Sequence, residues 1–227
     1  MTESGTHART TEVAIFGGRG GGTVAAQAIL NQTASGGALR LHGFLDDAVP
    51  AGTSVLGAPV LGRFESWKSL PEDVRFAAPL HKVGRMVERA ARIRGLGIPA
   101  DRWTTVIDPN AEIPESVSIG AGCVVSAHAV CQPGASLGNH VAIRSGAGIA
   151  HDCSIGDFAF VGFNAAVCGY VTVAEGAHIS PGACIRERVR IGAWSVVGLG
   201  AVVLSDVPEG VVVAGNPAQA IGSVAKP

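Results

Sequence analysis

The feature that most constrains this chain is a six-residue repeat that runs without insertion from Ile107 to Pro208. Divided from Ile107, this stretch gives seventeen hexads, from IDPNAE to VLSDVP. The first position is Ile, Leu or Val in sixteen of them, with Cys131 as the exception, and the fifth is always Ala, Val, Cys or Ser. A period of six is neither that of a helix nor that of a simple alternating strand. Self-similarity at such a fixed period predicts a parallel β-helix.

The repeat also predicts how side chains are placed on this column. Three hexads make one triangular coil, so residues n and n+18 are expected to stack, with first-position aliphatics and small fifth-position residues inside. Third and fourth positions form the corners, where Gly or Asn supplies the positive φ that tight corners need. The corner residues of this kind are Asn110, Gly122, Gly134, Gly146, Asn164, Gly176, Gly182 and Gly200. Because the flat outer faces of the column still carry apolar residues, we expect three copies to pack side by side as a homotrimer.

The residues before the repeat predict a small α/β unit that begins with a glycine-rich turn. Val13–Phe16 has the pattern of a buried strand, and Gly17–Gly22 follows it directly. Apolar residues then return at helical spacing from Val24 to Ile29. Strand, glycine-rich turn and helix together point backbone N–H groups and a helix dipole at a phosphate. A tight connection without a ligand is the alternative interpretation of the same turn.

A second expected strand, Leu41–Leu45, ends at Asp46 and Asp47. In a nucleotide-binding unit an acidic residue at this place commonly meets a ribose or base, although the pair could equally form a turn before Pro50. A third strand is expected at Val74–Ala78. The helix after it is expected to carry Val83, Met86, Val87, Ala90 and Ile93 on one face and to stop at Gly95. This β-α-β-α-β unit is too short for a full dinucleotide fold, so a mononucleotide or nucleotide-sugar site fits its size better.

The chain therefore divides into four segments. Residues 1–11 form a flexible N-terminus, 12–106 the nucleotide-sugar-binding subdomain, 107–208 the β-helix and 209–227 a C-terminal extension. Hydrophobic residues make up 47% and charged residues 15%, which excludes a disordered chain. The net charge is −1, with no block of Lys or Arg, which argues against nucleic acid or an anionic membrane as the main partner.

Two further features predict a cytoplasmic location. No apolar run approaches the roughly 18 residues that span a bilayer, and the first ten residues lack the hydrophobic core of a secretion signal.

The five cysteines form no CxxC pair. Four of them, Cys123, Cys131, Cys153 and Cys184, fall at first, fifth or sixth hexad positions. We interpret most of the cysteines as small core fillers in a reducing compartment and expect no metal site.

One corner of the repeat combines residues suited to proton transfer. Of the four repeat histidines, His151 alone is followed at its corner by a carboxylate, Asp152, which can fix the imidazole tautomer and raise its basicity. Eighteen residues later stands Gly169, whose backbone N–H could face an oxyanion formed above His151, as acyl transfer requires. The residues alone leave a solvated corner histidine as an equal alternative. His128, His140 and His178 are interpreted as solvated corner residues.

Residues 149–217, from IAHDCSIGDFAFVGFN to GVVVAGNPA, resemble the bacterial sugar acyltransferases of the NeuD/PglD type. The similarity extends toward the N-terminus through TVIDPNA and GFLDD to VAIFGGRGGGTVAAQAI. Its most specific part is His151–Asp157. The resemblance implies a Rossmann-like N-terminal subdomain followed by a left-handed β-helix. It also implies acetylation of amino sugars or sialic acids, many of them carried on nucleotides, with acetyl-CoA as the donor.

Carried over position by position, the resemblance assigns roles to individual residues. His151 is then the general base, Asp152 the acid that increases its basicity, and Gly169 an N–H donor to the thioester oxygen. Contacts to acetyl-CoA are implied for Phe160, Gly169, Pro181 and Leu199, and contacts to the nucleotide of the sugar for Gly18, Arg19, Gly20, Asp46 and Asp47. The resemblance also implies active sites between adjacent prisms of the trimer.

The sequence departs from the family pattern at three places. Phe160 stands where the family usually has a histidine, Ala78–His81 replaces the common Ile-Gly-Asp/Asn, and Asp108 replaces a frequent histidine. The expected activity is acetyl-CoA-dependent N-acetylation of a nucleotide-linked amino sugar, in which the amine attacks the thioester directly. A sugar O-acetyltransferase of the same fold and a non-catalytic binding protein remain the alternatives.

Overall fold

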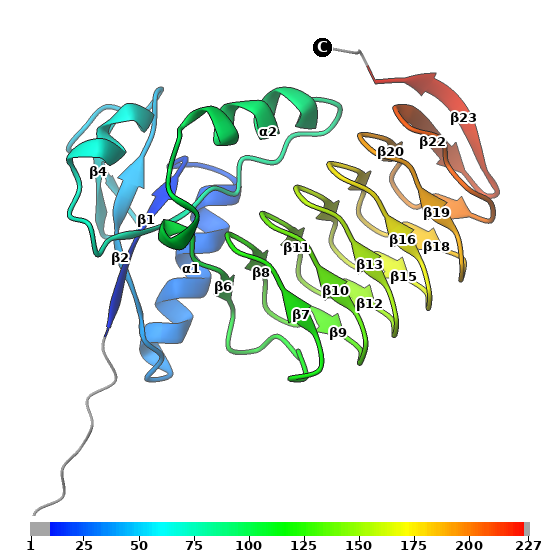
Figure 1. Ribbon diagram of the computed structural model, residues 1–227, viewed down its shortest axis with the longest axis horizontal. Helices are drawn as coiled ribbons and strands as arrows, with labels where there is room; N and C mark the ends of the chain where they lie inside the picture. Colours follow the sequence, from blue (N-terminus) through cyan, green and yellow to red (C-terminus); the bar gives the residue numbers. More distant parts are fainter. Residues whose placement is uncertain (1–9, 225–227) are drawn as a thin grey trace, which may run out of the picture.

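The computed structural model describes residues 10–224 as an α/β unit followed by a three-sided column of short strands (Figure 1). The expected flexible segment, residues 1–11, lies mostly outside the described residues. Strand β1 (Thr11–Phe16) already includes Thr11. Among the described residues, no helix has the length and apolarity needed to cross a membrane.

The N-terminal unit is a five-stranded sheet in the order β3-β4-β2-β1-β5. Its strands are β1, β2 (Leu39–Leu45), β3 (Ser54–Val55), β4 (Ala58–Gly62) and β5 (Arg75–Ala77). Its helical segments are α1 (Gly21–Ala34), η1 (Phe64–Ser69), α2 (Met86–Gly95) and η2 (Ala100–Arg102). All pairings are parallel except the β3–β4 hairpin, which the sequence analysis did not anticipate.

Alternation along β1 places the two main helices on opposite faces of this sheet. Val13 and Ile15 pack in the cluster that contains Ala25 and Ile29 of α1, whereas Phe16 packs with residues of α2. The prediction that Val83 lies on the buried face of α2 was wrong, because the helix begins at Met86 and Val83 is 54% exposed.

The column has three parallel sheets. The β9 sheet contains β9 (Val130–Cys131), β12 (Gly148–Ile149), β15 (Ala166–Val167), β18 (Cys184–Ile185) and β21 (Val202–Val203). The β7 sheet contains β7 (Ser118–Ile119), β10 (Ser136–Leu137), β13 (Ser154–Ile155), β16 (Thr172–Val173) and β19 (Arg190–Ile191).

The third, long sheet contains β6 (Val106–Ile107), β8 (Val124–Val125), β11 (Ala142–Ile143), β14 (Phe160–Val161), β17 (His178–Ile179), β20 (Val196–Val197), β22 (Val211–Gly215) and β23 (Ala218–Ser223). Along β7–β21 each residue pairs with the one eighteen positions away, as Ser136 does with Ser154, which confirms the predicted coil. The antiparallel pair β22–β23 closes the C-terminal end.

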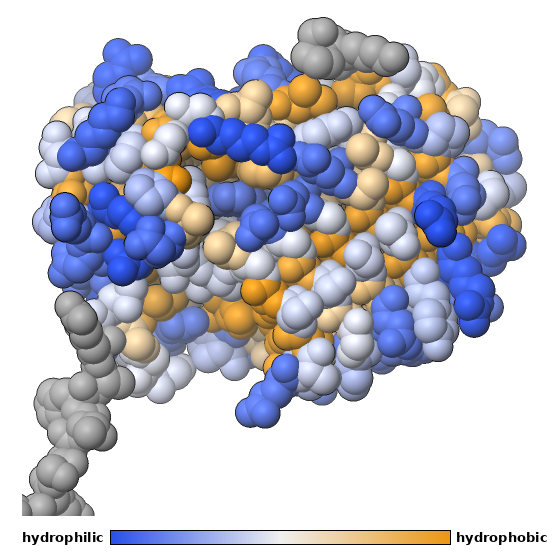
Figure 2. Space-filling view, viewed as in Figure 1, coloured by the Kyte–Doolittle hydropathy of each residue, from blue (hydrophilic) through white to orange (hydrophobic). Residues whose placement is uncertain are grey.

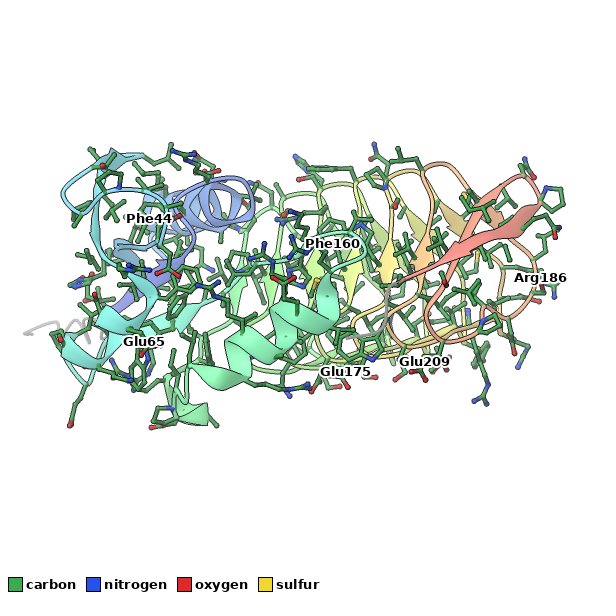
Figure 3. The ribbon with its side chains drawn as sticks, turned by 90° about the horizontal axis from the view of Figure 1, so that it is seen from above. Phe44, Glu65, Phe160, Glu175, Arg186 and Glu209 are labelled. Atoms are coloured by element: carbon green, nitrogen blue, oxygen red, sulfur yellow. The ribbon has the colours of Figure 1, made fainter. Side chains whose placement is uncertain are left out.

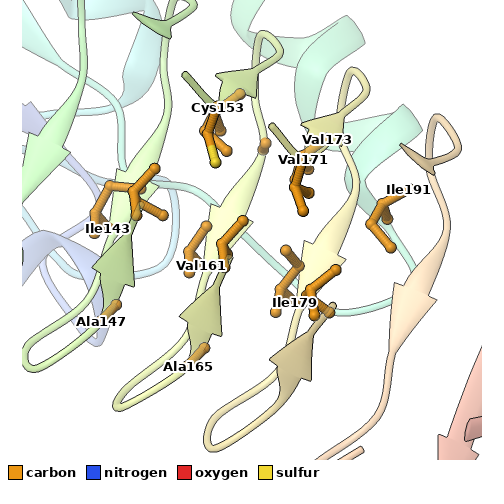
Figure 4. Packing of buried hydrophobic residues seen from close by; sticks show 14 of the residues in the cluster. Ile143, Ala147, Cys153, Val161, Ala165, Val171, Val173, Ile179 and Ile191 are labelled. Carbon is orange, nitrogen blue, oxygen red and sulfur yellow. The ribbon is translucent and has the colours of Figure 1, made fainter. Parts of the chain in front are cut away.

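The interior of the column follows the repeat. First-position residues from Val125 to Val203 and fifth-position residues from Val117 to Val207 are all buried, which confirms both predicted inward positions. Figure 4 shows these side chains stacked in rows across successive coils, with Val161 between Ile143 of the preceding coil and Ile179 of the next. Cys123, Cys131 and Cys153 belong to this core, whereas Cys168 and Cys184 are exposed, so most of the cysteines are core residues, as predicted.

The corners need a left-handed backbone more generally than the glycines indicated. Every fourth-position residue from Gly122 to Gly200 has positive φ, and seven of these residues are neither Gly nor Asn: His128, His140, Asp152, Phe158, Tyr170, Arg188 and Trp194. Asn110 does not have positive φ, so its predicted corner conformation was wrong. Positive φ costs a non-glycine residue about 1–2 kcal/mol, and here the stacked coils impose it.

The three edges of the prism differ in what lies beside them. The α2 edge comprises turns 121–122, 139–140, 157–158 and 175–176 and packs against α2, where Arg94 pairs with Glu175. The Leu199 edge comprises turns 127–128, 145–146, 163–164, 181–182 and 199–200. Its first three turns face α1 across a cavity. The His151 edge comprises turns 133–134, 151–152, 169–170 and 187–188 and joins the β9 and β7 sheets. The N-terminal unit packs on the long sheet, so the His151 edge lies opposite it.

Candidate active site

The turn between β12 and β13 brings an imidazole and a carboxylate together on the His151 edge. His151 Nδ1 lies 2.9 Å from Oδ2 of Asp152, and both side chains are about half exposed. The backbone N–H of His151 donates to Oε1 of Gln132 on the preceding coil. The backbone carbonyl of His151 accepts a hydrogen bond from the N–H of Tyr170 on the next coil. These contacts fix the imidazole with Nδ1 toward the carboxylate, which leaves Nε2 to accept a proton.

Two glycines create the space that this pair occupies. A Cβ on Gly169 would lie 2.8 Å from Cε1 and 2.9 Å from Nε2 of His151, so the ring lies directly against the backbone of the next coil. A Cβ on Gly134, one coil below, would lie 2.5 Å from Oδ1 of Asp152. The corner therefore tolerates no side chain above the imidazole or below the carboxylate. Gly134 was not anticipated, although its position eighteen residues before Asp152 could have identified it.

The N–H of Gly169 is the candidate oxyanion donor. Within residues 10–224 it donates to no other group, while the carbonyl of Gly169 accepts from Arg188. A free N–H beside Nε2 of His151 can donate to an oxygen that becomes negative during attack on a thioester. Tyr170 stands beside it, with its ring 5.1 Å from the imidazole in edge-to-face geometry and with the Arg188 guanidinium 4.4 Å from its other side.

The glycine-rich turn leaves the first turn of α1 open for an anion. Gly20 precedes the helix with φ of 53°, no side chain caps the helix, and its first turn contains no acidic residue. Within α1 itself, no side chain of the first turn neutralises the positive end of the helix. Gly22 packs so closely on the carbonyl of Gly17 that a Cβ there would overlap it, which explains a glycine at this position. Gly18, Arg19 and Gly20 form this turn, and their contact with the nucleotide stays a prediction.

Asp46 and Asp47 lie at the end of β2 next to this turn, and both contact the backbone. Asp46 accepts hydrogen bonds from the N–H groups of Gly18, Ala48 and Val49 at 2.7 to 3.0 Å. Burial pushes the pKa of Asp46 upward, but these hydrogen bonds outweigh it and hold the pKa below its usual value. Asp47 accepts from the N–H of Phe64 and pairs with Arg92 of α2. Both carboxylates line a cavity of about 250 Å³ at the ends of β2 and β4.

The residues expected to contact acetyl-CoA lie on different parts of the prism. Pro181 and Leu199 stack on the Leu199 edge, and Leu199 is 75% exposed. Phe160 instead lies on the long sheet, partly buried under the N-terminal unit, where it stacks on His178 at 4.3 Å between ring centroids. Figure 3 shows Phe160 near the junction between the two parts of the chain. Within one chain, His151, Leu199 and the glycine-rich turn are therefore not brought together.

Sequence reasoning missed a buried basic cluster around Phe160. Arg144 is 6% exposed, with its Cζ 5.3 Å from the Phe160 ring centroid, and His81 approaches the same ring at 5.7 Å. Burial lowers the pKa of His178 and of His140 to about 4 and that of His81 to about 3, so all three imidazoles are neutral. The interpretation of His140 and His178 as solvated corner residues was wrong, because they are 7% and 4% exposed. In the part of the chain that the structure describes, no three His, Cys, Asp or Glu side chains form a metal-binding group.

Comparison with known proteins gives similarity over most of the chain. No family model matches it. The GDP-perosamine N-acetyltransferase of Escherichia coli O157:H7 is 31% identical over 183 residues, which cover 78% of this chain and 80% of that enzyme.

Two solved structures have the same architecture. The acetyltransferase domain of PglB from Neisseria gonorrhoeae FA1090, in complex with acetyl coenzyme A, superposes with a TM-score of 0.79 at 32% identity, covering 93% of this chain and all of that one. PerB from Caulobacter crescentus, in complex with CoA and GDP-perosamine, has a TM-score of 0.77 at 29% identity and covers 93% and 97%. Variants of the Caulobacter enzyme with one histidine replaced by Asn or Ala have also been solved. These matches confirm the predicted fold class, a Rossmann-like unit followed by a left-handed β-helix.

Proposed function

This chain belongs to the PglD-like family of hexapeptide-repeat sugar N-acetyltransferases, and from that membership we propose that it transfers the acetyl group of acetyl-CoA to the amino group of a nucleotide-linked amino sugar. The observation that carries the proposal is the His151–Asp152 pair, 2.9 Å apart, beneath the side-chain-free backbone of Gly169. The relatives' binding of CoA, acetyl coenzyme A and GDP-perosamine supports both substrates.

The chemistry follows from the geometry of this corner. The neutral sugar amine attacks the thioester carbonyl carbon, and the carbonyl oxygen, as it becomes negative, accepts a hydrogen bond from the N–H of Gly169. His151 accepts the amine proton at Nε2, and Asp152 stabilises the imidazolium through Nδ1. The C–S bond then breaks as the carbonyl re-forms, and the leaving CoA thiolate takes the proton from Nε2 of His151, which returns the imidazole to its neutral form. The amine itself is the nucleophile, so no acyl-enzyme forms.

We further propose that the complete site forms between two copies in a homotrimer. The His151 edge lies opposite the N-terminal unit, whereas Pro181 and Leu199 lie on another edge. Within one chain the proposed base is therefore far from the predicted nucleotide contacts and from the predicted acetyl-CoA contacts. When prisms pack side by side around a three-fold axis, the His151 edge of one copy can lie against the Leu199 edge of the next. Figure 2 shows apolar bands that run over the coils of the prism, the kind of surface such packing would cover.

The general-base role has a direct kinetic test. His151→Ala is expected to lower turnover of acetyl-CoA with a nucleotide amino sugar by on the order of 10²-fold or more, because the attacking amine loses its proton acceptor. His42→Ala, which removes a partly exposed histidine of β2 that pairs with Glu12, is the matched control and is expected to retain trimer and turnover. Unchanged turnover in a folded His151→Ala protein would remove this mechanism.

A further inference from the structure

The most unusual group outside the proposed catalytic corner is Arg144, at the second position of its hexad directly after β11. Its side chain is buried on the long sheet, where burial lowers its pKa. Within residues 10–224 it forms no ion pair, and its Nη1 is buried without a hydrogen-bond partner. A buried guanidinium without a carboxylate is expensive, because its charge has lost water and gained no counter-charge. Burial of this kind favours an anion that the described chain does not supply.

No carboxylate pairs with Arg144 in the part of the chain that the structure describes, and its neighbours are buried imidazoles. Nδ1 of His178 and both ring nitrogens of His81 are also buried without partners, although the backbone carbonyl of His140 lies close to His81. The flat faces of the Phe160 and His178 rings stack at 5° to each other and hold this set in place. The cation beside both imidazoles is Arg144, whose charge adds to burial in lowering the pKa of His81 and of His178.

Arg144 also faces the open N-terminus of α1. A Cβ on Gly21, the first residue of the helix, would lie 3.2 Å from Nη2 of Arg144 and would overlap the carbonyl of Pro79. The guanidinium therefore reaches from the prism to the uncapped helix end that already favours negative charge. Guanidinium groups bind phosphate through two parallel N–H bonds, and helix N-termini bind it through backbone N–H groups.

We propose that Arg144, together with the first turn of α1, binds the diphosphate of the nucleotide-linked substrate, with His81 and His178 as neutral hydrogen-bond donors around it. This inference rests on the proposed function. It assigns the phosphate contact to a prism residue, so that substrate spans the junction between the two parts of the chain. Coenzyme A also carries a diphosphate. The nucleotide is favoured because Asp46, which lines a cavity at the ends of β2 and β4, accepts a hydrogen bond from the N–H of Gly18 in the same turn.

The test is calorimetric titration of the purified protein with UDP, GDP, their nucleosides and coenzyme A. Arg144→Gln is expected to weaken binding of the preferred nucleoside diphosphate by on the order of 10- to 100-fold, while affinity for the nucleoside and for coenzyme A stays unchanged. Arg186→Gln is the matched control, because Arg186 is at the same hexad position but exposed at the far end of the prism (Figure 3). The Arg186→Gln protein is expected to bind the nucleoside diphosphate and coenzyme A as the wild type does.

A second variant keeps the test informative if Arg144→Gln fails to fold. Arg144→Lys retains the charge but not the paired N–H geometry, so a loss confined to the nucleoside diphosphate, smaller than that of Arg144→Gln, supports the site. Full diphosphate affinity in a folded Arg144→Gln or Arg144→Lys protein that still acetylates overturns the Arg144 site and leaves the proposed function standing. A loss confined to coenzyme A also overturns it. If the wild type binds no nucleoside diphosphate and acetylates no nucleotide amino sugar, the proposed function fails as well.

Discussion

At the residue scale, two glycines decide where the reacting side chains can lie. Gly169 leaves room for the His151 imidazole against the next coil, and Gly134 leaves room for the Asp152 carboxylate against the previous one. Asp152 itself is held at φ of 58°, a conformation that the corner imposes and that directs its carboxylate toward Nδ1 of His151. The same spacing of eighteen that builds the core therefore also fixes the orientation of the proposed base.

The first prediction concerns Gly169. Replacing it by Ala places a methyl group 2.8 Å from Cε1 of His151, which must displace the ring from the position where Nε2 meets the amine. We expect Gly169→Ala to lower kcat on the order of 10²-fold. Steady-state kinetics and thermal unfolding of each variant make the measurement.

Gly148→Ala is the control for this substitution, because a Cβ on Gly148 of β12 meets nothing within 4 Å. It should keep wild-type turnover. A fully active Gly169→Ala protein would mean that the imidazole need not lie against this backbone.

The second prediction concerns acid stability. Burial keeps His140 and His178 neutral with pKa values of about 4, against 6.5 for an exposed histidine. Between these values the unfolded chain binds more protons than the folded one, so stability is full above pH 6.5 and falls as the pH drops toward 4. Each histidine contributes a slope of about 1.4 kcal/mol per pH unit within that window.

Urea unfolding at a series of pH values measures this slope. His178→Phe keeps a ring against Phe160 and removes one titrating group, so its slope should be shallower than that of the wild type. Equal slopes in the two proteins would show that His178 does not titrate between the folded and unfolded states in this range.

At the element scale, the prism could be derived from the sequence almost completely, because its repeat is a direct measure of position. Inward residues, the pairing register and the His151–Asp152–Gly169 corner all follow from counting in sixes and eighteens. The N-terminal unit has no sequence repeat from which the position of each residue can be counted. The β3–β4 hairpin and the later start of α2 depend on packing between elements far apart in the chain.

The buried cluster shows the same limit. Arg144 and His178 lie at hexad positions that point outward from the prism, and they are buried where the N-terminal unit, including the segment around His81 and the start of α1, covers the long sheet. Likewise, positive φ at Tyr170 or Trp194 could not be predicted from residue type, because such residues normally avoid it and only the stacked coils enforce it. Local preference was overruled by long-range packing in both cases.

The third prediction tests the core of the prism. Ile179 is fully buried between coils, so Ile179→Ala leaves a cavity and is expected to lower the free energy of unfolding by about 2–5 kcal/mol. Ile221→Ala, at a site 68% exposed in β23, should change it by less than about 0.5 kcal/mol. Denaturant unfolding compares the two. Equal effects would contradict the burial pattern described here.

At the scale of the whole molecule, the proposed base and the proposed donor contacts lie on different edges of one prism, and the N-terminal unit lies away from the base. In the proposed trimer a second copy brings them together. Sedimentation at micromolar concentration should therefore give a trimer, and a monomer would contradict the arrangement.

The fourth prediction uses mixed trimers. His151→Ala removes the base from one edge, and Leu199→Arg places a charge on the other, at a side chain that is 75% exposed. Each variant alone should be nearly inactive. Subunit exchange should restore part of the activity, because some sites then combine an intact His151 edge with an intact Leu199 edge. Exchange confirmed by native mass spectrometry without any recovery would place the site within one chain.

The measurement that tests the central claim most directly is thiol release from acetyl-CoA in the presence of nucleotide amino sugars and their hydroxyl analogues, with product mass as the second readout. We predict release and a mass gain of one acetyl group with an amino sugar, no release with the matching hydroxyl sugar, and loss of both signals in His151→Ala. Acetylation of the hydroxyl sugar alone, or of neither sugar across UDP-, GDP- and dTDP-linked panels, would contradict the proposed N-acetyltransferase activity.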